Sequence, residues 1–360
     1  MPNWTESMQQ TFEYYTVDPI TWEDVKLVEH VISCDIDRDM TTDTLESASI
    51  ELGEDIGETY IRVYLITIQN GVKERHPLGT FLIQTIPTSF NGRTKEISAD
   101  AYSPLIELNE KYPPFGFSVV KGSDIMEQVY MLTRENLRAP VVKPSCNETL
   151  FNHFVVEPDD KWLSCIKDLM ANAKYIFNLD EKSRVLFAPK QKVETLQPVW
   201  TFDDGNSSIL YPDMDSELDL YGIPNVVEVM YSDGVHYDKD NGNKVYYARV
   251  VNDDPDSPTS TVRRGREIVH RVTDPTIIGD PTGPRIKEYA ETLLKELSTV
   301  ERTISYTHGY CPVRTGDCVR INYERAGITN IKARVISQNI SCVPGTPVSE
   351  TAVYTKKYWR

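Results

Sequence analysis

The chain has 360 residues, of which 40% are hydrophobic and 26% charged, a composition typical of folded protein and not of a disordered chain. Its 54 acidic and 38 basic side chains give a formal net charge of −16, which opposes tight binding to the phosphates of nucleic acids. The length predicts two to four compact units, each with its own hydrophobic core.

The first third of the chain is dominated by strand patterns. Residues 1–24 are rich in aromatic side chains but too short to fold alone, which predicts an arm that docks on the rest of the chain or on another subunit. The clearest strand spans residues 60–68 and is followed by Asn70-Gly71, a dipeptide typical of hairpin turns. A second turn at Asn91-Gly92 leads into another alternating run. These short strands predict a small antiparallel barrel or sandwich.

The pattern becomes helical after Pro113-Pro114. Residues 124–138 predict a helix that begins with a capping box, and a second helix begins near Asp159-Asp160. The second helix has an apolar face, which we interpret as core: Trp162, Ile166, Leu169, Met170 and Ala173. Residues 175–187 predict a hairpin on this helix, whereas the acidic stretch at 197–224 has little periodicity and predicts a connecting loop.

Strand patterns return in the last third. Residues 226–231 and 245–251 predict strands, and Pro284 begins a third amphipathic helix. From residue 300 onward the sequence predicts four further strands: 303–308, 317–322, 331–342 and 351–358. The predicted order is therefore β, α+β, β, with a helical excursion inside the last part.

Carboxylates are the obvious catalytic candidates in so acidic a chain, because paired acids can act as general acid and base. The candidates are Asp203-Asp204, the alternating Asp213, Asp215, Glu217 and Asp219, and Asp253-Asp254-Asp256. The run from Asp213 begins like a calcium loop, but Leu218 and Pro224 stand where a glycine and a bidentate glutamate are needed. We interpret all three groups as solvated acidic loops.

Thiols and imidazoles give no clear site. The six cysteines include no C-x-x-C pair, which predicts buried free thiols. One alternative stays open, in which Cys311, Cys318 and Cys342 hold a metal or an iron–sulfur cluster with His308 as the fourth ligand. His308, His270 and His30 lie in strand-like runs, where hydrogen-bonded packing is commoner than catalysis. We therefore predict no catalytic residue, no cofactor and no metal.

The basic cluster Arg263-Arg264-Gly265-Arg266 allows two interpretations. It either binds an acidic partner or balances neighbouring carboxylates, and we favour the second. The start MPNWTESMQQ lacks the basic and apolar stretches of a signal peptide, and the chain has no apolar run of membrane-spanning length. We therefore expect the protein to be made and kept in the cytoplasm.

Five segments, in this order, share a pattern with one protein family: residues 53–57 (GEDIG), 77–83 (PLGTFLI), 221–229 (YGIPNVVEV), 251–260 (VNDDPDSPTS) and 307–319 (THGYCPVRTGDCV). They resemble the baseplate or tail-tip hub proteins of tailed bacteriophages, and the similarity runs from about residue 18 to the end. The resemblance implies a non-enzymatic virion protein, assembled in the host cytoplasm.

The resemblance also implies an architecture: a mainly β chain with α+β inserts, made of two small antiparallel β-barrels of tail-tube type plus a helix-containing domain. The implied domains are an arm at 1–24, a first barrel at 25–117, a small α+β domain with its acidic connecting loop at 118–222, a second barrel at 223–235 and 299–360, and an α+β insertion at 236–298 with a helix at 284–297. Three copies would form a pseudo-sixfold ring that caps the tail tube.

Partners and surface follow from the same resemblance. The implied partners are two further copies, a tail-tube or distal tail ring protein, a tape-measure protein, and spike or fibre proteins. DNA would pass the channel without specific binding, and we hypothesise that carboxylates on the channel wall repel its phosphates. The sequence ends at Arg360, so we expect cell-wall digestion and receptor binding to belong to other proteins.

Two other functions remain open. A carbohydrate- or host-binding β-sandwich module of a virion would suit the 20 tyrosines, which serve as stacking residues at binding surfaces. A carboxylate-based hydrolase would require one close pair of acids in a cleft with a strongly shifted pKa. A three-fold oligomer with an open channel distinguishes the hub from both.

Overall fold

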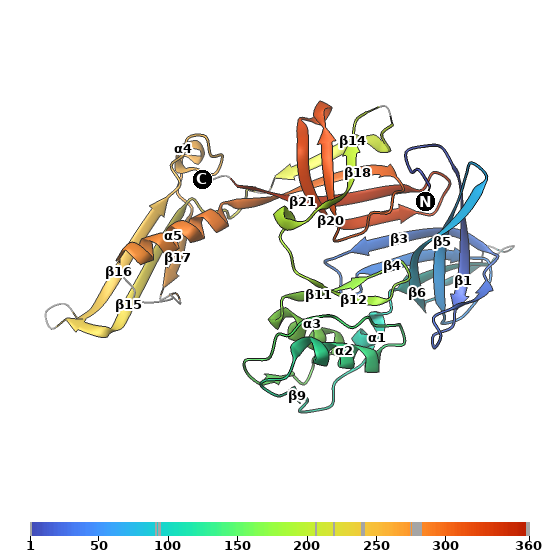
Figure 1. Ribbon diagram of the computed structural model, residues 1–360, viewed down its shortest axis with the longest axis horizontal. Helices are drawn as coiled ribbons and strands as arrows, with labels where there is room; N and C mark the ends of the chain where they lie inside the picture. Colours follow the sequence, from blue (N-terminus) through green and yellow to red (C-terminus); the bar gives the residue numbers. More distant parts are fainter. Residues whose placement is uncertain are drawn as a thin grey trace. The chain divides into compact units, whose positions relative to one another are not determined.

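The computed structural model describes residues 2–90, 92, 95–205, 207–218, 220–238, 242–273, 275 and 283–357. The chain is mainly β and divides into two compact units (Figure 1). Unit 1 comprises Met1–Met214 and Ser305–Ala352, and unit 2 comprises Asp215–Ile304 and Val353–Arg360. Among the described residues, no helix has both the length and the apolar character needed to span a membrane.

The first β region of unit 1 consists of eight strands: β1 (Gln9–Val17), β2 (Asp24–Leu27), β3 (Val31–Asp39), β4 (Glu46–Leu52), β5 (Tyr60–Gln69), β6 (Val72–Thr85), β7 (Thr88–Phe90) and β8 (Lys95–Tyr102). They pair in the order β3-β4-β8-β6-β5-β1-β2, and β7 also pairs with β8. The predicted hairpin is confirmed as β5 and β6, joined by Asn70 and Gly71 at φ values of 50° and 79°. Both central residues are left-handed, as this hairpin turn requires.

The N-terminal residues are part of this sheet. The sequence predicts an arm at 1–24, whereas in the structure residues 9–17 form β1, which pairs with β5 along its whole length. Trp4, before the strand, packs its ring 5.0 Å from the rings of His76 and Tyr310. The aromatic residues that suggested an arm therefore serve as anchors within unit 1, because burying them stabilises the docked segment.

The small α+β domain follows: α1 (Ile106–Glu110), β9 (Ser118–Val119), α2 (Ile125–Asn136), β10 (Phe154–Val155), α3 (Trp162–Asn172), β11 (Tyr175–Leu179), β12 (Val185–Pro189) and the 3₁₀ turn η1 (Val193–Thr195). The helices are confirmed where the sequence predicted them, and the side chain of Asp124 accepts a hydrogen bond from Glu127 N at 2.8 Å. The predicted apolar face of α3 is buried in the core of this domain.

The second β region consists of β13 (Pro198–Asp203), β14 (Leu210–Leu218), β18 (Thr299–Gly309), β19 (Cys318–Tyr323), the turn η2 (Glu324–Ala326), β20 (Ile328–Ser341) and β21 (Pro347–Lys357). The connecting loop predicted at 197–224 is wrong, because β13 and β14 lie within it. β13 runs parallel to β19, from Pro198 beside Cys318 to Asp203 beside Asn322. A strand partner more than a hundred residues away is invisible to local periodicity.

The two β regions form one sheet. β20 of the second region pairs antiparallel with β3 of the first, from Ser337 beside Asp39 to Ser341 beside Asp35 (Figure 1). The resulting sheet has fourteen strands, and its longest path runs β14-β18-β21-β20-β3-β4-β8-β6-β5-β1-β2. The β20–β3 junction thus joins segments from opposite ends of the chain.

Unit 2 contains β15 (Val226–Asp238), β16 (Gly242–Val251), α4 (Thr261–Arg264), β17 (Val269–Thr273) and α5 (Gly283–Leu297). The predicted domains place residues 223–235 in the second barrel and begin an insertion at 236. In the structure β15 lies instead in a separate three-stranded sheet, in the order β16-β15-β17. The reason is packing, because Val227 and Val229 of β15 are buried against Ile286 and Leu294 of α5.

Candidate functional site

Strands of the large sheet carry accessible polar side chains on one face and buried side chains on the other. In β3, Asp35, Asp37 and Asp39 are accessible, whereas the intervening Ile36 and Arg38 are buried. The alternation follows from the two-residue period of a β-strand. It continues across six neighbouring strands, in the order β18-β21-β20-β3-β4-β8.

We call this surface the polar face. It consists of Ser305 and Thr307 (β18), Ser349 and Thr351 (β21), Ser337, Asn339 and Ser341 (β20), Ser33, Asp35, Asp37 and Asp39 (β3), Ser47, Ser49 and Glu51 (β4), and Ser98, Asp100 and Tyr102 (β8). Apart from Tyr102, these side chains are short hydroxyl, amide and carboxylate groups. None of these residues is lysine or arginine, so together they carry only negative charge. The first half of β20 also has Lys332 and Arg334 on its non-buried side, where they donate to the backbone oxygens of Leu196 and Gln191.

The polar face is continuous across the strand boundaries. The backbone register places Ser341, Asp35, Ser49 and Asp100 in one row that crosses β20, β3, β4 and β8. Neighbours in such a row lie about 4.5–5.5 Å apart, so their side chains touch. A stripe of alternating hydroxyls and carboxylates therefore crosses the junction between the two β regions.

Neutral donors hold the carboxylates of the polar face. Asn339 Nδ2 donates to Asp37 Oδ1 at 2.7 Å, and Ser341 Oγ donates to Asp35 Oδ1 at 2.7 Å, both across the β20–β3 junction. Hydroxyl and amide donors orient a carboxylate without cancelling its charge. The junction is thus closed by side-chain hydrogen bonds on the accessible side, while the face stays negative.

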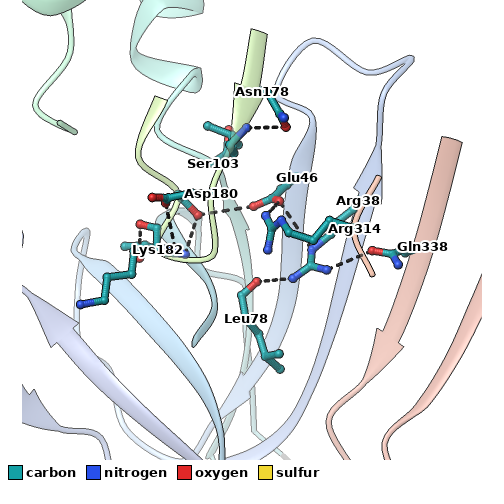
Figure 2. Close-up of polar contacts among 12 residues, drawn as sticks. Arg38, Glu46, Leu78, Ser103, Asn178, Asp180, Lys182, Arg314 and Gln338 are labelled. Carbon is teal, nitrogen blue, oxygen red and sulfur yellow. Dashed lines mark hydrogen bonds and ion pairs between the residues drawn. The ribbon is translucent and has the colours of Figure 1, made fainter. Parts of the chain in front are cut away.

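A buried charge network lies on the opposite side of the junction (Figure 2). Arg38 of β3, 1% exposed, donates to Gln338 Oε1 at 3.0 Å and to the backbone oxygen of Leu78 at 2.6 Å. Its Nε lies 3.5 Å from Glu46 Oε1, and Arg314 also donates to Glu46. One carboxylate from the first β region therefore pairs with guanidinium groups from both regions.

The network continues into β18 and β21. Gln338 donates to Glu350, which also accepts a hydrogen bond from Tyr306 Oη at 2.6 Å and lies 3.2 Å from His308 Nε2. All four side chains are buried. Burial, together with the neighbouring carboxylate of Glu350, raises the pKa of Tyr306 well above its usual value, so its hydroxyl remains a donor.

The turn between β11 and β12 inserts into the first β region. Thr80 N donates to Ser183 Oγ at 2.8 Å, and Lys182 O accepts hydrogen bonds from Thr80 Oγ1 and Trp22 Nε1, both at 3.0 Å. Ser183 Oγ lies 3.4 Å from Glu46, so the turn reaches the charge network. Figure 2 shows Asp180 and Lys182 of this turn together with Glu46. The small α+β domain is therefore locked to the sheet next to the β20–β3 junction.

Two shifted pKa values follow from this burial. Burial, and then the charge of Arg314, lower the pKa of Arg38 to about 10, which leaves the guanidinium charged at neutral pH. Burial raises the pKa of Asp317, although its carboxylate accepts a hydrogen bond from Arg314 N at 2.9 Å. At the junction, the pKa values of Arg38 and Asp317 thus both depend on burial and on the neighbouring charge of Arg314.

The acidic candidates from the sequence serve turns and a strand. Asp203 Oδ1 accepts from Gly205 N at 2.9 Å, and Asp254 Oδ1 accepts from Asp256 N at 2.9 Å, both within turns. Asp213 to Glu217 lie in the extended strand β14, not in a loop that could surround an ion. Asp219 lies outside the described residues. Asp203 and Asp254 therefore have local roles in turns.

The three-cysteine alternative is not assembled. Cys311 Sγ lies 3.9 Å from His308 Nδ1, Cys318 Sγ contacts its neighbouring backbone oxygen, and Cys342 N donates to the backbone oxygen of Cys34. In the described part of the chain, no group of three or more His, Cys, Asp or Glu side chains is arranged to hold a metal. His308 packs in the buried network, whereas His30 and His270 are exposed.

One residue of the basic cluster has a local role. Arg264 Nη1 donates to Ile223 O at 2.8 Å and Arg264 Nη2 donates to Leu220 O at 3.1 Å, so this side chain satisfies backbone oxygens within unit 2. Gly265 adopts a φ of 61° and ends α4 in a left-handed conformation. Arg264 therefore stabilises a local turn, and the two interpretations of Arg263 and Arg266 stay predictions.

Sequence reasoning missed the polar face. Its signal is present in the alternation of Asp35, Asp37 and Asp39 and in repeated serine and threonine residues at every second position of later strands. Each strand alone is an ordinary amphipathic strand. Only the pairing order shows that the polar sides of six strands form one surface.

The comparisons with known proteins concern the fold. Neither the protein-family models nor the curated proteins gave a match. Among solved structures, a tail protein from Neisseria meningitidis MC58 superimposes with a TM-score of 0.63 at 15% identity, covering 97% of this chain and 98% of that one. The 43 kDa tail protein of prophage MuSo2 from Shewanella oneidensis gives 0.62 at 11%, covering 95% and 98%. The chain has a phage tail protein fold. This tail-protein fold spans nearly the whole chain, as the resemblance in the sequence implied.

Proposed function

We propose that this chain is the structural hub of a phage tail tip or baseplate, in which three copies form a pseudo-sixfold ring that caps the tail tube. The polar face is the observation that carries the proposal. Its residues carry carboxylates, hydroxyls and amides and include no lysine or arginine, on a chain with a tail-protein fold. In the ring it lines the channel through which DNA leaves.

The chemistry of the polar face suits a passage better than a binding site. Lysine and arginine bind phosphates and release counterions, which would hold DNA on the wall. Carboxylates such as Asp35 and Asp37 repel phosphates instead, and short hydroxyl groups leave few apolar surfaces to which bases could adhere. DNA therefore slides past this wall without specific binding.

The number of strands supports a wide channel. Each copy has a row of eight neighbouring strands from β14 through β20 and β3 to β7. Three copies would then contribute about 24 strands, more than the 16–18 strands at which a closed barrel already leaves an aqueous channel. Among the described strands of one copy, the order of the large sheet is open and does not close into a ring.

The remaining parts of the proposal concern partners and place. The ring contacts a tail-tube or distal tail ring protein on one side and tape-measure, spike or fibre proteins on the other. The protein is assembled in the host cytoplasm, stays in the virion tail and has no catalytic activity of its own. The small α+β domain and unit 2 lie outside the polar face in sequence and supply surfaces for these partners.

The first test is the mass of the purified protein by light scattering, followed by particle images averaged without imposed symmetry. We expect a three-fold ring with six similar lobes and an open centre, alone or with the neighbouring tail proteins. A compact monomer that stays single at high concentration, even with those proteins, contradicts the hub and favours a glycan-binding module.

A further inference from the structure

The β20–β3 junction places two cysteines opposite each other. The backbone register sets Ser341 beside Asp35, so the next opposed pair along the two strands is Cys342 and Cys34. Cys342 N donates to Cys34 O at 2.9 Å, as expected of residues that face each other across an antiparallel pair. The junction thus brings together two thiols that are more than three hundred residues apart in the sequence.

Both cysteine side chains lie on the buried side of the sheet. Cys34 is 2% exposed and Cys342 is 9% exposed, and their neighbours two positions away, Ile36 and Ile340, are buried as well. Directly opposed residues of an antiparallel pair point to the same face of the sheet. The two thiols therefore meet on the side of the junction opposite the polar face.

The spacing at this position fits a disulfide bond. Opposed Cα atoms at a hydrogen-bonded position of an antiparallel pair lie about 5.5 Å apart, within the range of about 4.4–6.8 Å found for disulfides. Hydrogen bonding to the Cys342 thiol, together with burial, raises the pKa of Cys34. The two thiols, which are free in the structure, therefore already interact before any bond joins them.

The hydroxyl of Tyr14 in β1 contacts the same two thiols. Burial raises the pKa of Tyr14, and the nearby thiols of Cys34 and Cys342 raise it further, so the hydroxyl keeps its proton and acts as a donor. Its hydrogen bond opposes the rise in the pKa of Cys34, because a donor stabilises the thiolate. Tyr14 therefore holds the two sulfur atoms near one donor.

We propose that Cys34 and Cys342 form a disulfide bond that joins the two β regions when the protein meets a small disulfide oxidant, RSSR. The thiolate of Cys342, the more exposed cysteine, attacks the oxidant, which breaks the S–S bond of the oxidant, forms a mixed disulfide and releases RS⁻. The thiolate of Cys34 then attacks Cys342 Sγ and releases a second RS⁻. The two protein thiols lose two electrons and two protons, and RSSR becomes two RSH.

The disulfide adds a covalent bond to a junction that hydrogen bonds hold on the accessible side, where Asn339 donates to Asp37 and Ser341 donates to Asp35. A cross-link between residues so distant in the sequence restricts the unfolded chain strongly, because the entropy of loop closure grows with loop length. The oxidised protein is therefore more resistant to unfolding than the reduced protein. This inference depends on the β20–β3 pairing and not on the proposed ring.

Peptide mapping of the wild-type protein tests the pairing without any substitution. The folded protein is incubated with oxidised glutathione at about pH 8.5, where an ordinary thiol is half ionised. The remaining thiols are then alkylated, and trypsin is applied without reductant. Cys34 lies in the tryptic peptide 27–38 and Cys342 in the tryptic peptide 335–356, and each of these peptides contains one cysteine. We expect the two peptides to appear as one linked species that separates on reduction.

The same oxidation in urea is the matched control. Unfolding exposes all six thiols, so the unfolded protein should form a mixture of disulfides. The proposal is wrong if the unfolded protein is oxidised while the folded protein keeps Cys34 and Cys342 alkylated, carries glutathione on Cys342 alone, or links either cysteine to a different one. Each of these results leaves the hub proposal unaffected.

Urea unfolding measures the consequence of the bond. The oxidised wild type should have a higher urea midpoint than the reduced wild type, and reductant should remove the difference. Cys342→Ala should abolish the effect of the oxidant, whereas Cys165→Ala, which removes a buried thiol of the small α+β domain, should retain it. Equal midpoints of the two wild-type forms, or an oxidant effect that persists in Cys342→Ala, contradict a stabilising disulfide at the junction.

Discussion

Glu46 shows how a single buried residue holds the two β regions together. It is 3% exposed and pairs with Arg38 from the first region and Arg314 from the second. An apolar residue of similar size would pack as well, and buried ion pairs often add little net stability. We expect their value to lie in specificity, because the buried guanidinium of Arg38 and the half-buried guanidinium of Arg314 both pair with the carboxylate of Glu46. We therefore expect the network to favour the β20–β3 register over other strand pairings.

Glu46→Ala should destabilise the protein strongly. The substitution leaves two guanidinium groups without their carboxylate, and breaking a buried pair in this way costs about 3–5 kcal/mol. Urea unfolding followed by tryptophan fluorescence measures the change. Asp43→Ala removes a carboxylate from an exposed pair with Lys167 and should change stability by about 1 kcal/mol or less. Equal effects of the two substitutions would contradict a structural role of the buried network.

Asp317 predicts a pH dependence. Burial raises its folded-state pKa, so the folded protein holds the proton more tightly than the unfolded chain. The associated stability is fully present below the unfolded pKa, about 3.9 for aspartate, and is lost as the pH rises through the folded pKa. Asp317→Asn removes this dependence. The stability of the wild type relative to the variant should therefore fall from pH 4 upward, measured as urea midpoints, and a constant difference would refute the assignment.

At the scale of elements, local signals in the sequence predicted the hairpin and the helices that are stabilised by contacts between residues close in the sequence. The Asn70-Gly71 turn correctly predicted one hairpin. The Asp124 cap and the apolar face of α3 correctly predicted two helices. The strand β13 was missed because it depends on β19, more than a hundred residues downstream. β14 was missed because its alternating acids look like a solvated loop when its neighbour β18 is not known.

The predicted domain ranges show the same limit. The strand pattern at 226–231 was correct, but periodicity does not say which sheet a strand joins. β15 packs on α5, which begins more than forty residues later, and so forms its own sheet with β16 and β17. The polar face was likewise hidden, because its residues come from six strands between Ser33 and Thr351. Pairing between strands that are distant in the sequence, and not composition, decides which sheet β15 joins and which strands form the polar face.

For the whole molecule, the distribution of charge distinguishes a channel wall from a merely soluble surface. Net charge alone repels DNA equally from every side, whereas the proposal assigns the repulsion to the polar face. The triple variant Asp35→Lys, Asp37→Lys, Glu51→Lys should make purified rings retain double-stranded DNA at low salt, with retention falling steeply as salt rises. A filter-binding titration at several salt concentrations measures this.

A matched variant distinguishes the effect of where the lysines lie from the effect of the changed net charge. Glu148, Glu157 and Asp159 are exposed residues of the small α+β domain, and their replacement by lysine changes the net charge by the same amount. In the ring, lysines on the polar face act together from three copies around one channel, so the retained DNA should thread the ring, and linear DNA should be retained better than closed circles. Equal retention by the two variants, without a preference for DNA ends, would mean that the polar face is an outer surface and that the acids serve solubility.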